Sequence, residues 1–254
     1  MIFESLSNIE FIDVIIISCH LLVIGVLIIT GILFYGKSRG KASNIKKYLK
    51  GIILFMLIYS VSRLVMFIFE LTFDPFIWQL TPTETEIALT YDPNLNFRYS
   101  IFWYTGTILG AIAFFIILFD LETFILLKKT KYIPSAFLAI IYILGLSLGA
   151  VGAEQITLGK FFLSISAIFP LLIPITYFFF AYKSSGDTRR RAIGAGIGFT
   201  IFFLGIGLNS TMGKAIFIFL LSPEEIVGVY ASYIMYAVLA IIGLIIFLKS
   251  IHYE

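Results

Sequence analysis

The sequence predicts an all-α, polytopic membrane protein that forms one domain of seven transmembrane helices, with the N-terminus outside and the C-terminus inside. Three observations lead to this fold class: the composition, the repeated apolar runs and the distribution of basic residues. Of the 254 residues, 60% are hydrophobic and only 13% are charged, and the mean hydropathy is +1.03. Soluble domains carry about a quarter charged residues, so the composition indicates an integral membrane protein.

Apolar runs define the seven expected helices, because about 20 apolar residues cross the hydrocarbon core as an α-helix. The spans are residues 12–36, 51–72, 99–127, 132–151, 161–182, 192–213 and 226–248. The fourth span is the shortest. The sixth could extend to residue 221, because AIFIFLL follows Lys214 and is typical of a re-entrant or interfacial segment.

Lysine and arginine set the orientation of the helices. The connections after spans 1, 3 and 5 and the C-terminus hold 14 of these residues, whereas the other side holds only Arg98, Lys160 and Lys214. Cytoplasmic loops of membrane proteins carry the basic excess. The basic side is therefore expected to face the cytoplasm of a multi-pass cell-membrane protein.

The connection between spans 2 and 3, residues 73–98, is the only long outer loop. Three prolines punctuate it, and TETEIALTY between them alternates as a short strand does. A hairpin over the outer mouth is expected here. It could be a lid over a pocket or an ordered loop without a ligand.

The stretch LIYSVSRLVMFIFE, residues 57–70, places Arg63 within a span, where an unpaired charge is costly. Counted from Lys50 at 1.5 Å per residue, Arg63 lies about 20 Å from the inner edge, and Asp120 lies about 12 Å from that edge in the next span. Their side chains lean toward each other because Cβ atoms tilt toward the N-terminus of each helix. We therefore expect a buried Arg63–Asp120 pair, with Glu122 as the alternative partner.

Further polar side chains fall in the outer halves of the spans and are candidates for lining a ligand pocket open to the outside. They could instead form separate interhelical hydrogen bonds and interfacial tyrosine contacts. The candidate ligand-binding residues are His20, Arg63, Glu70, Tyr104, Asn209, Tyr233 and Tyr236.

No catalytic, metal or cofactor motif accompanies these residues. HExxH, GxSxG, Walker A and CxxC patterns are absent, and the chain has one cysteine and two histidines. The seventh span has no lysine that could hold a retinal Schiff base. We therefore expect no enzyme activity, no cofactor, no metal site and no nucleic-acid partner.

The segment YKSSGDTRRRAIGAGIGFTIFFLGIGLNS joins a basic loop to a glycine-dotted sixth span. Together with the seven-helix topology, it resembles the seven-transmembrane sensory or receptor-like domains of prokaryotic signalling proteins. The resemblance implies a sensor. Because no kinase or other effector segment follows span 7, that sensor is expected to act through a separate cytoplasmic effector.

Three functions fit these features. The first is a receptor-like or sensory membrane protein that binds a ligand in its outer half and acts through a separate partner. The second is a small-solute or proton-coupled transporter that uses Arg63, Asp120 and His20, although no internal repeat or pair of broken helices supports it. The third is a non-catalytic subunit of a larger membrane complex. In each case the lipid bilayer is the surrounding partner.

Overall fold

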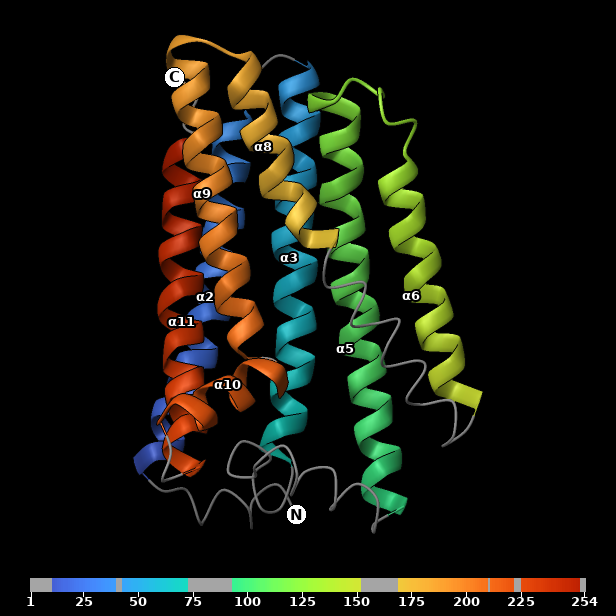
Figure 1. The fold of residues 1–254 in the computed structure, drawn as a ribbon, viewed down its shortest axis with the longest axis vertical. Coiled ribbons are helices and arrows are strands. Elements are labelled where there is room, and N and C mark those ends of the chain that lie inside the picture. The colour runs from blue at the N-terminus through green and yellow to red at the C-terminus, as the bar shows by residue number, and fades with distance from the viewer. Residues whose placement is uncertain are drawn as a thin grey trace.

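The computed structural model describes residues 11–39, 43–72, 93–151, 169–209, 211–221 and 225–251, and all regular structure in these ranges is helical (Figure 1). The long helices run side by side along the longest axis of the molecule. The elements are α2 (Phe11–Ser38), α3 (Ser43–Leu71), α5 (Pro93–Asp120), the π-helix η2 (Leu121–Ile125), α6 (Ile133–Val151), the 3₁₀ turn η3 (Phe169–Leu171), α8 (Leu172–Lys183), α9 (Gly186–Leu208), α10 (Thr211–Leu221) and α11 (Glu225–Ser250).

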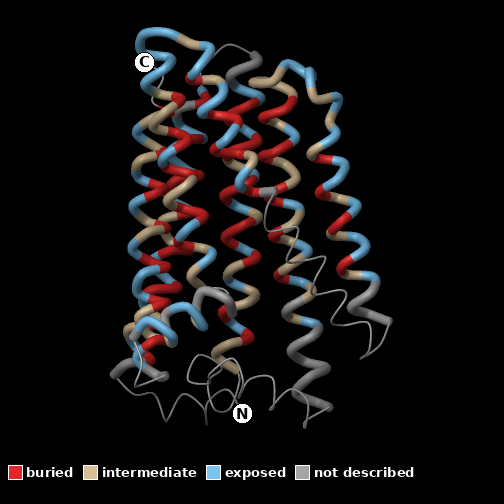
Figure 2. The backbone as a smooth tube through the Cα atoms, viewed as in Figure 1, coloured by how far each residue is buried: buried red, intermediate tan, exposed pale blue. Residues whose placement is uncertain are grey.

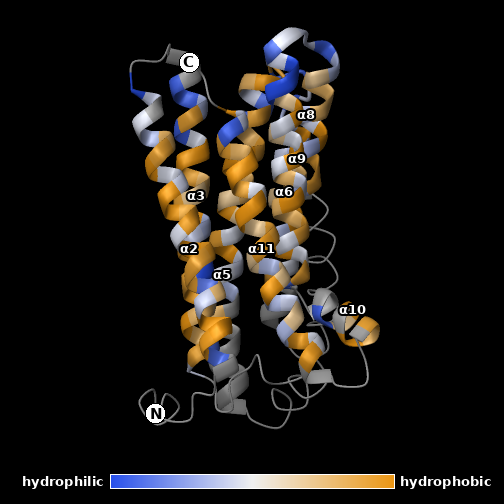
Figure 3. Cartoon of the chain, turned by 90° about the vertical axis from the view of Figure 1, so that its left-hand side faces the viewer, coloured by the Kyte–Doolittle hydropathy of each residue, from blue (hydrophilic) through white to orange (hydrophobic). Residues whose placement is uncertain are grey.

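Five helical segments are long and apolar enough to cross a membrane: Asp13–Gly36, Lys46–Leu71, Tyr104–Ile125, Gly186–Leu208 and Val227–Ser250. The segment Ile133–Ser147 within α6 is a shorter apolar helix. Exposed residues follow the outward faces of these helices, and many of the residues along the helices are hydrophobic (Figures 2 and 3). Large apolar side chains are among the exposed ones, for example those of Ile29 and Ile32 on α2. Such faces suit contact with lipid chains, and the chain is a multi-pass membrane protein.

The helix boundaries agree closely with three of the seven predicted spans. The first span corresponds to α2, the fourth to α6 and the seventh to α11, each within two residues at both ends. The second and third helices begin earlier than expected, at Ser43 and Pro93. The fifth span is described from Phe169, where η3 leads into α8. Residues 73–92, with the expected hairpin, lie outside the described residues.

The sixth span differs most from its prediction. Helix α9 ends at Leu208, and α10 is a separate helix that begins at Thr211. Ile218 of α10 packs so closely on Gly228 of α11 that a Cβ atom at Gly228 would lie 2.6 Å from the Ile218 Cα. Helix α10 therefore packs at the end of the bundle where α11 begins, and its exposed Phe219 and Leu220 point away from the core.

The two ends of the bundle differ in charge. One end, here called the basic end, collects the end of α2, the start of α3, the η2–α6 turn, the α8–α9 junction and the end of α11. Figure 3 shows the hydrophilic residues gathered there. The other end, here called the α10 end, collects the starts of α2 and α11 and the ends of α3 and α9. This alternation of helix directions gathers the basic connections at one end, as the sequence predicts.

Glycines bring α9 and α11 into backbone contact. A Cβ atom at Gly198 would lie 2.6 Å from the Phe247 nitrogen, and one at Gly205 would lie 2.8 Å from the Ala240 nitrogen. On the facing helix, a Cβ atom at Gly243 would lie 2.6 Å from the Gly198 carbonyl oxygen. Small residues allow such close approach in membrane bundles. The four-residue glycine spacing in this span thus serves packing within the chain.

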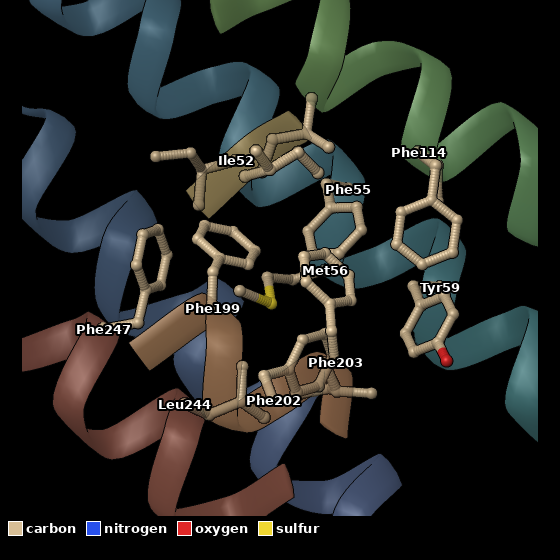
Figure 4. Packing of buried hydrophobic residues seen from close by; sticks show 14 of the residues in the cluster. Ile52, Phe55, Met56, Tyr59, Phe114, Phe199, Phe202, Phe203, Leu244 and Phe247 are labelled. Atoms are coloured by element: carbon tan, nitrogen blue, oxygen red, sulfur yellow. The ribbon is translucent and has the colours of Figure 1, made fainter. Parts of the chain in front are cut away.

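A layer of aromatic side chains fills the middle of the bundle (Figure 4). Its rings pack with centroids 4.3 to 6.5 Å apart, in stacked, tilted and edge-to-face arrangements. We call it the aromatic layer, and it consists of Phe55, Tyr59, Phe114, Phe199, Phe202, Phe203 and Phe247. All seven side chains are buried, and they come from α3, α5, α9 and α11.

Candidate functional site

Toward the α10 end, four helices bring charged and aromatic side chains together in the interior. Helix α2 supplies His20, α3 supplies Arg63 and Glu70, α10 supplies Lys214, and α11 supplies two tyrosines. We call this group the polar cluster, and its members are His20, Arg63, Glu70, Lys214, Tyr233 and Tyr236. A group of this kind inside an apolar bundle is expensive to bury, and such groups are typical of functional sites in membrane proteins.

His20 lies at the centre of the polar cluster and is only 1% exposed. Its Nε2 lies 3.4 Å from Oε2 of Glu70. Its ring stacks on Phe67 at a centroid distance of 5.2 Å and meets the edge of Tyr233 at the same distance. A third ring, that of Tyr236, lies 5.7 Å away. These contacts tie α2 to α3 and α11 and orient the imidazole toward the carboxylate.

The two basic side chains each lie against a tyrosine of α11. The Arg63 guanidinium carbon is 5.6 Å from the centroid of the Tyr236 ring. The Lys214 ammonium is 4.4 Å from the Tyr233 ring centroid, and its Nζ donates a hydrogen bond of 2.5 Å to the Tyr233 hydroxyl. Glu70 lies within electrostatic range of both cations. Ring faces attract cations most strongly where water is excluded, so the tyrosines stabilise the buried charges.

Several buried polar atoms of the polar cluster have no hydrogen-bond partner among the described residues. They are Nδ1 of His20, Nε of Arg63 and the hydroxyl of Tyr236, whereas Nε2 of His20 and Oε2 of Glu70 have only each other, at 3.4 Å. Among the described residues outside the cluster, only Oδ1 of Asn209 is a buried side-chain polar atom without a hydrogen-bond partner. Buried polar groups are nearly always paired with protein, water or ligand. The concentration of unpaired atoms in one place therefore marks a site that can bind a polar molecule.

Five of the seven candidate ligand-binding residues meet in this cluster: His20, Arg63, Glu70, Tyr233 and Tyr236. The other two are Tyr104, half-buried on α5, and Asn209, which follows the end of α9. Their part in ligand binding stays a prediction. Lys214 belongs to the cluster but was expected only as an outer-loop charge. Lys214 directly precedes the apolar run AIFIFLL, and this was the sequence signal that it lies within the protein.

The predicted Arg63–Asp120 pair is wrong. The Asp120 carboxylate lies directly against Gly51, at the position that a Cβ atom of that glycine would occupy. Gly51 precedes Arg63 by twelve residues on α3, about 18 Å along the helix axis. The depth comparison failed because it set Lys50 and Lys128 at the same level, whereas Asp120 is level with Gly51, beside Lys50. Arg63 instead lies among Tyr59, Tyr236 and Glu70.

Glu122, the alternative partner, is also at the basic end. Its side chain is fully buried and accepts hydrogen bonds from the Thr130 hydroxyl and from the backbone N–H of Ser135, the latter at 3.1 Å. The Ser135 hydroxyl also donates to it. Ser135 is in the first turn of α6, where N–H groups lack helical partners. Glu122 therefore caps α6 and has a local structural role.

Comparison with protein-family models, curated proteins and solved structures found no match to this chain. Among the described residues, no group of three or more histidine, cysteine, aspartate or glutamate side chains is arranged to hold a metal ion.

Proposed function

We propose that this protein is a seven-helix, receptor-like protein of the cell membrane that binds a small anionic ligand in the polar cluster and acts through a separate partner. In this proposal α2, α3, α5 with η2, α6, α8, α9 and α11 are the seven spans, and the basic end faces the cytoplasm. The alternating helix directions and the basic excess at one end support that topology. The observation that carries the function is the convergence of unpaired, buried polar atoms in the polar cluster.

The charges of the cluster favour an anion. Two basic side chains, Arg63 and Lys214, accompany one carboxylate, that of Glu70. A second carboxylate, that of Asp13, is not counted in the cluster, because Asp13 precedes His20 by seven residues on α2, about 10 Å along the axis. An anion near Arg63 and Lys214 would offset the second cation, and Arg63 would offer it a hydrogen bond from Nε. The Tyr236 hydroxyl and an N–H of His20 are further donors for the same ligand.

The aromatic layer favours a receptor over a carrier. On α3, Phe55 lies between Tyr48 near the basic end and Arg63 in the cluster. On α11, Phe247 lies between Ser250 and the cluster tyrosines. The rings of the layer are buried and in mutual contact. A carrier needs polar groups that continue toward both faces, and this apolar layer interrupts them, whereas a receptor needs only a site on the ligand side.

Ligand binding is tested with the purified protein in dodecyl maltoside. Sodium acetate, lactate, succinate and phosphate are titrated against sodium chloride at matched ionic strength, and the unfolding temperature is followed. A bound anion stabilises the folded state, so at least one of these anions should raise the unfolding temperature in a saturable way. Arg63→Met and Lys214→Met should each remove the shift. Lys249→Gln, an exposed change at the basic end, is the control and should retain it.

The proposal fails if none of the four anions shifts the unfolding temperature, or if the shift persists in both cluster variants. Transport is tested separately: liposomes that contain the protein should take up none of the anion that binds, and uptake would identify a carrier instead. For the topology, a cysteine at exposed Arg190 in a Cys19→Ser background should react with a membrane-impermeant maleimide only after the cells are permeabilised. Reaction in intact cells would reverse the orientation.

A further inference from the structure

A second site lies at the basic end, separated from the polar cluster by the aromatic layer. It is a cavity of about 610 Å³, open to the surface, that is lined by residues of α3, η2, α8, α9 and α11. Pockets that bind small organic molecules are typically about 300–1,000 Å³. Nothing in the proposed function uses this cavity.

One wall of the cavity is the π-helix η2, which contributes Thr123, Phe124 and Ile125. A π-helical turn inserts an extra residue into a helix and is often found at functional sites. The turn that follows is unusual as well, because Leu127, Lys128, Lys131 and Tyr132 have positive φ angles of 49° to 61°. Non-glycine residues are strained in this region and persist where surrounding contacts hold them. Glu122 provides such contacts.

Other lining residues combine charge with hydrogen-bonding groups. Asp187 and Arg191 both line the cavity from the first turns of α9, four residues apart and thus on one face of that helix. Thr188 lies between them in the sequence and also faces the cavity. From α3 and α8 come Tyr48 and Tyr177, whose hydroxyls are hydrogen-bonded to each other. These residues therefore present one acidic and one basic group to the same space.

Apart from Ser250, the remaining lining is apolar. Phe124, Ile125 and Phe180 line the cavity together with the exposed Leu127. A molecule that fills this space therefore meets an acidic group, a basic group and aromatic and aliphatic surface. A simple inorganic ion would leave the apolar part unfilled, and an apolar molecule would make no use of the two charged groups.

We propose that this cavity binds a zwitterionic amphiphile that carries a phosphate, an ammonium group and an acyl chain. The phosphate lies against the Arg191 guanidinium, which can donate two parallel hydrogen bonds to it. The ammonium lies against the Asp187 carboxylate. The acyl chain packs on Phe124, Ile125 and Phe180. Such a head group occurs both in bilayer phosphatidylethanolamine and in soluble lysolipids or short-chain derivatives.

The binding experiment uses dihexanoyl-phosphatidylethanolamine below its micelle concentration and the full-length protein in dodecyl maltoside. The lipid should raise the unfolding temperature with a saturable midpoint. Dihexanoyl-phosphatidylglycerol, which lacks the ammonium, and phosphoethanolamine, which lacks the chains, should each need at least tenfold higher concentration. Arg191→Gln and Asp187→Asn should raise the midpoint for phosphatidylethanolamine at least tenfold. Arg190→Gln is the matched control, because Arg190 is exposed on the same helix and does not line the cavity.

Arg191→Lys provides a second variant that keeps the charge but loses the two-pronged geometry, and its midpoint should fall between those of the wild type and Arg191→Gln. The proposal is overturned if no lipid stabilises the protein, if phosphatidylglycerol binds as well as phosphatidylethanolamine, or if Asp187→Asn has the affinity of the wild type. Native mass spectrometry from nanodiscs distinguishes the two sources. Retention of long-chain phosphatidylethanolamine by the wild type, but not by Arg191→Gln, identifies the bilayer, and binding of the short-chain lipid alone identifies a soluble amphiphile.

Discussion

Replacement of Gly243 by alanine tests the close contact between α9 and α11. A Cβ atom at this position would meet the Phe202 nitrogen, and it would lie 2.6 Å from the Gly198 carbonyl oxygen and 2.8 Å from the Phe202 Cα. These are backbone atoms, which cannot rotate away as a side chain can. The helices must therefore separate to admit the methyl group, and the contacts along both helices weaken.

The expected magnitude follows from a comparison with Gly25→Ala. No atom lies within 4 Å of a Cβ at Gly25, which is also inside a long helix. Alanine exceeds glycine in helix propensity by about 1 kcal/mol, and this gain applies to both variants. Overpacking costs about 1–3 kcal/mol and applies to Gly243→Ala alone. The free energy of unfolding of Gly243→Ala should therefore be about 1–3 kcal/mol below that of Gly25→Ala.

The assay is unfolding by sodium dodecyl sulfate in mixed micelles, followed by the fluorescence of the two tryptophans. Gly25→Ala should match or exceed the wild type, and Gly243→Ala should fall below it. Equal stability of the two alanine variants would refute the close packing of α9 on α11. A Cβ at Gly198 meets the same α9–α11 contact from the other helix. The double alanine variant of Gly198 and Gly243 should therefore lose less free energy of unfolding than the sum of the two single losses.

Three further results are expected from the same unfolding assay. Glu122→Ala should lose about 1–3 kcal/mol, because it leaves buried donors at the start of α6 without an acceptor; a loss under 0.5 kcal/mol would contradict the capping role. Tyr48→Phe and Tyr177→Phe each remove one end of the same hydrogen bond. The double variant should therefore be about 1 kcal/mol more stable than the sum of the two single losses predicts. Full additivity would exclude the hydrogen bond. Arg63→Gln and Asp120→Asn should add within about 0.5 kcal/mol, because these residues lie far apart on the bundle, and strong coupling would restore the discarded pair.

Hydropathy predicted the positions of the helices well, because the bilayer requires spanning segments to be apolar. A spanning segment must satisfy its backbone internally and present apolar side chains, and these demands are visible in one sequence. The break between α9 and α10 was missed for the same reason. The apolar pattern resumes after Lys214, and only the turn at Asn209, whose N–H bonds back to the Ile206 carbonyl, ends the first helix. Composition does not distinguish a continued helix from a short turn followed by a second one.

The candidate site was predicted in part, through depth alone. Counting residues along each span placed His20 and Arg63 at similar depths, and they do converge. The same counting failed for Asp120, because it needs the vertical register of α3 against α5. That register follows from packing, such as the fit of the Asp120 carboxylate against Gly51 and the hydrogen bond of 2.7 Å from the Ser62 hydroxyl to the Gly106 carbonyl. A single sequence carries no direct record of such contacts.

The contact between α9 and α11 at Gly194, Gly198, Gly205 and Gly243, here called the glycine seam, runs from the polar cluster to the cavity at the basic end. A Cβ at Gly205 would lie 3.0 Å from the carbonyl oxygen of Tyr236, a member of the polar cluster. At the other end, a Cβ at Gly194 would meet the side chain of Ser250, which lines the cavity. Between these points α9 and α11 form the most extensive helix–helix contact among the described elements. Backbone contacts leave no side-chain layer that can rearrange, so a displacement at one end moves both helices together.

This rigidity gives a direct test of how a change in the polar cluster reaches the basic end. Spin labels at Arg190→Cys on α9 and Lys249→Cys on α11, in a Cys19→Ser background, report the distance between the two helices. Glu70→Gln changes the charge of the cluster without contact with either label. The distance distribution should be the same with and without Glu70→Gln, because α9 and α11 move as one body. A shifted or broadened distance distribution would show that α9 and α11 separate, and would exclude rigid coupling between them.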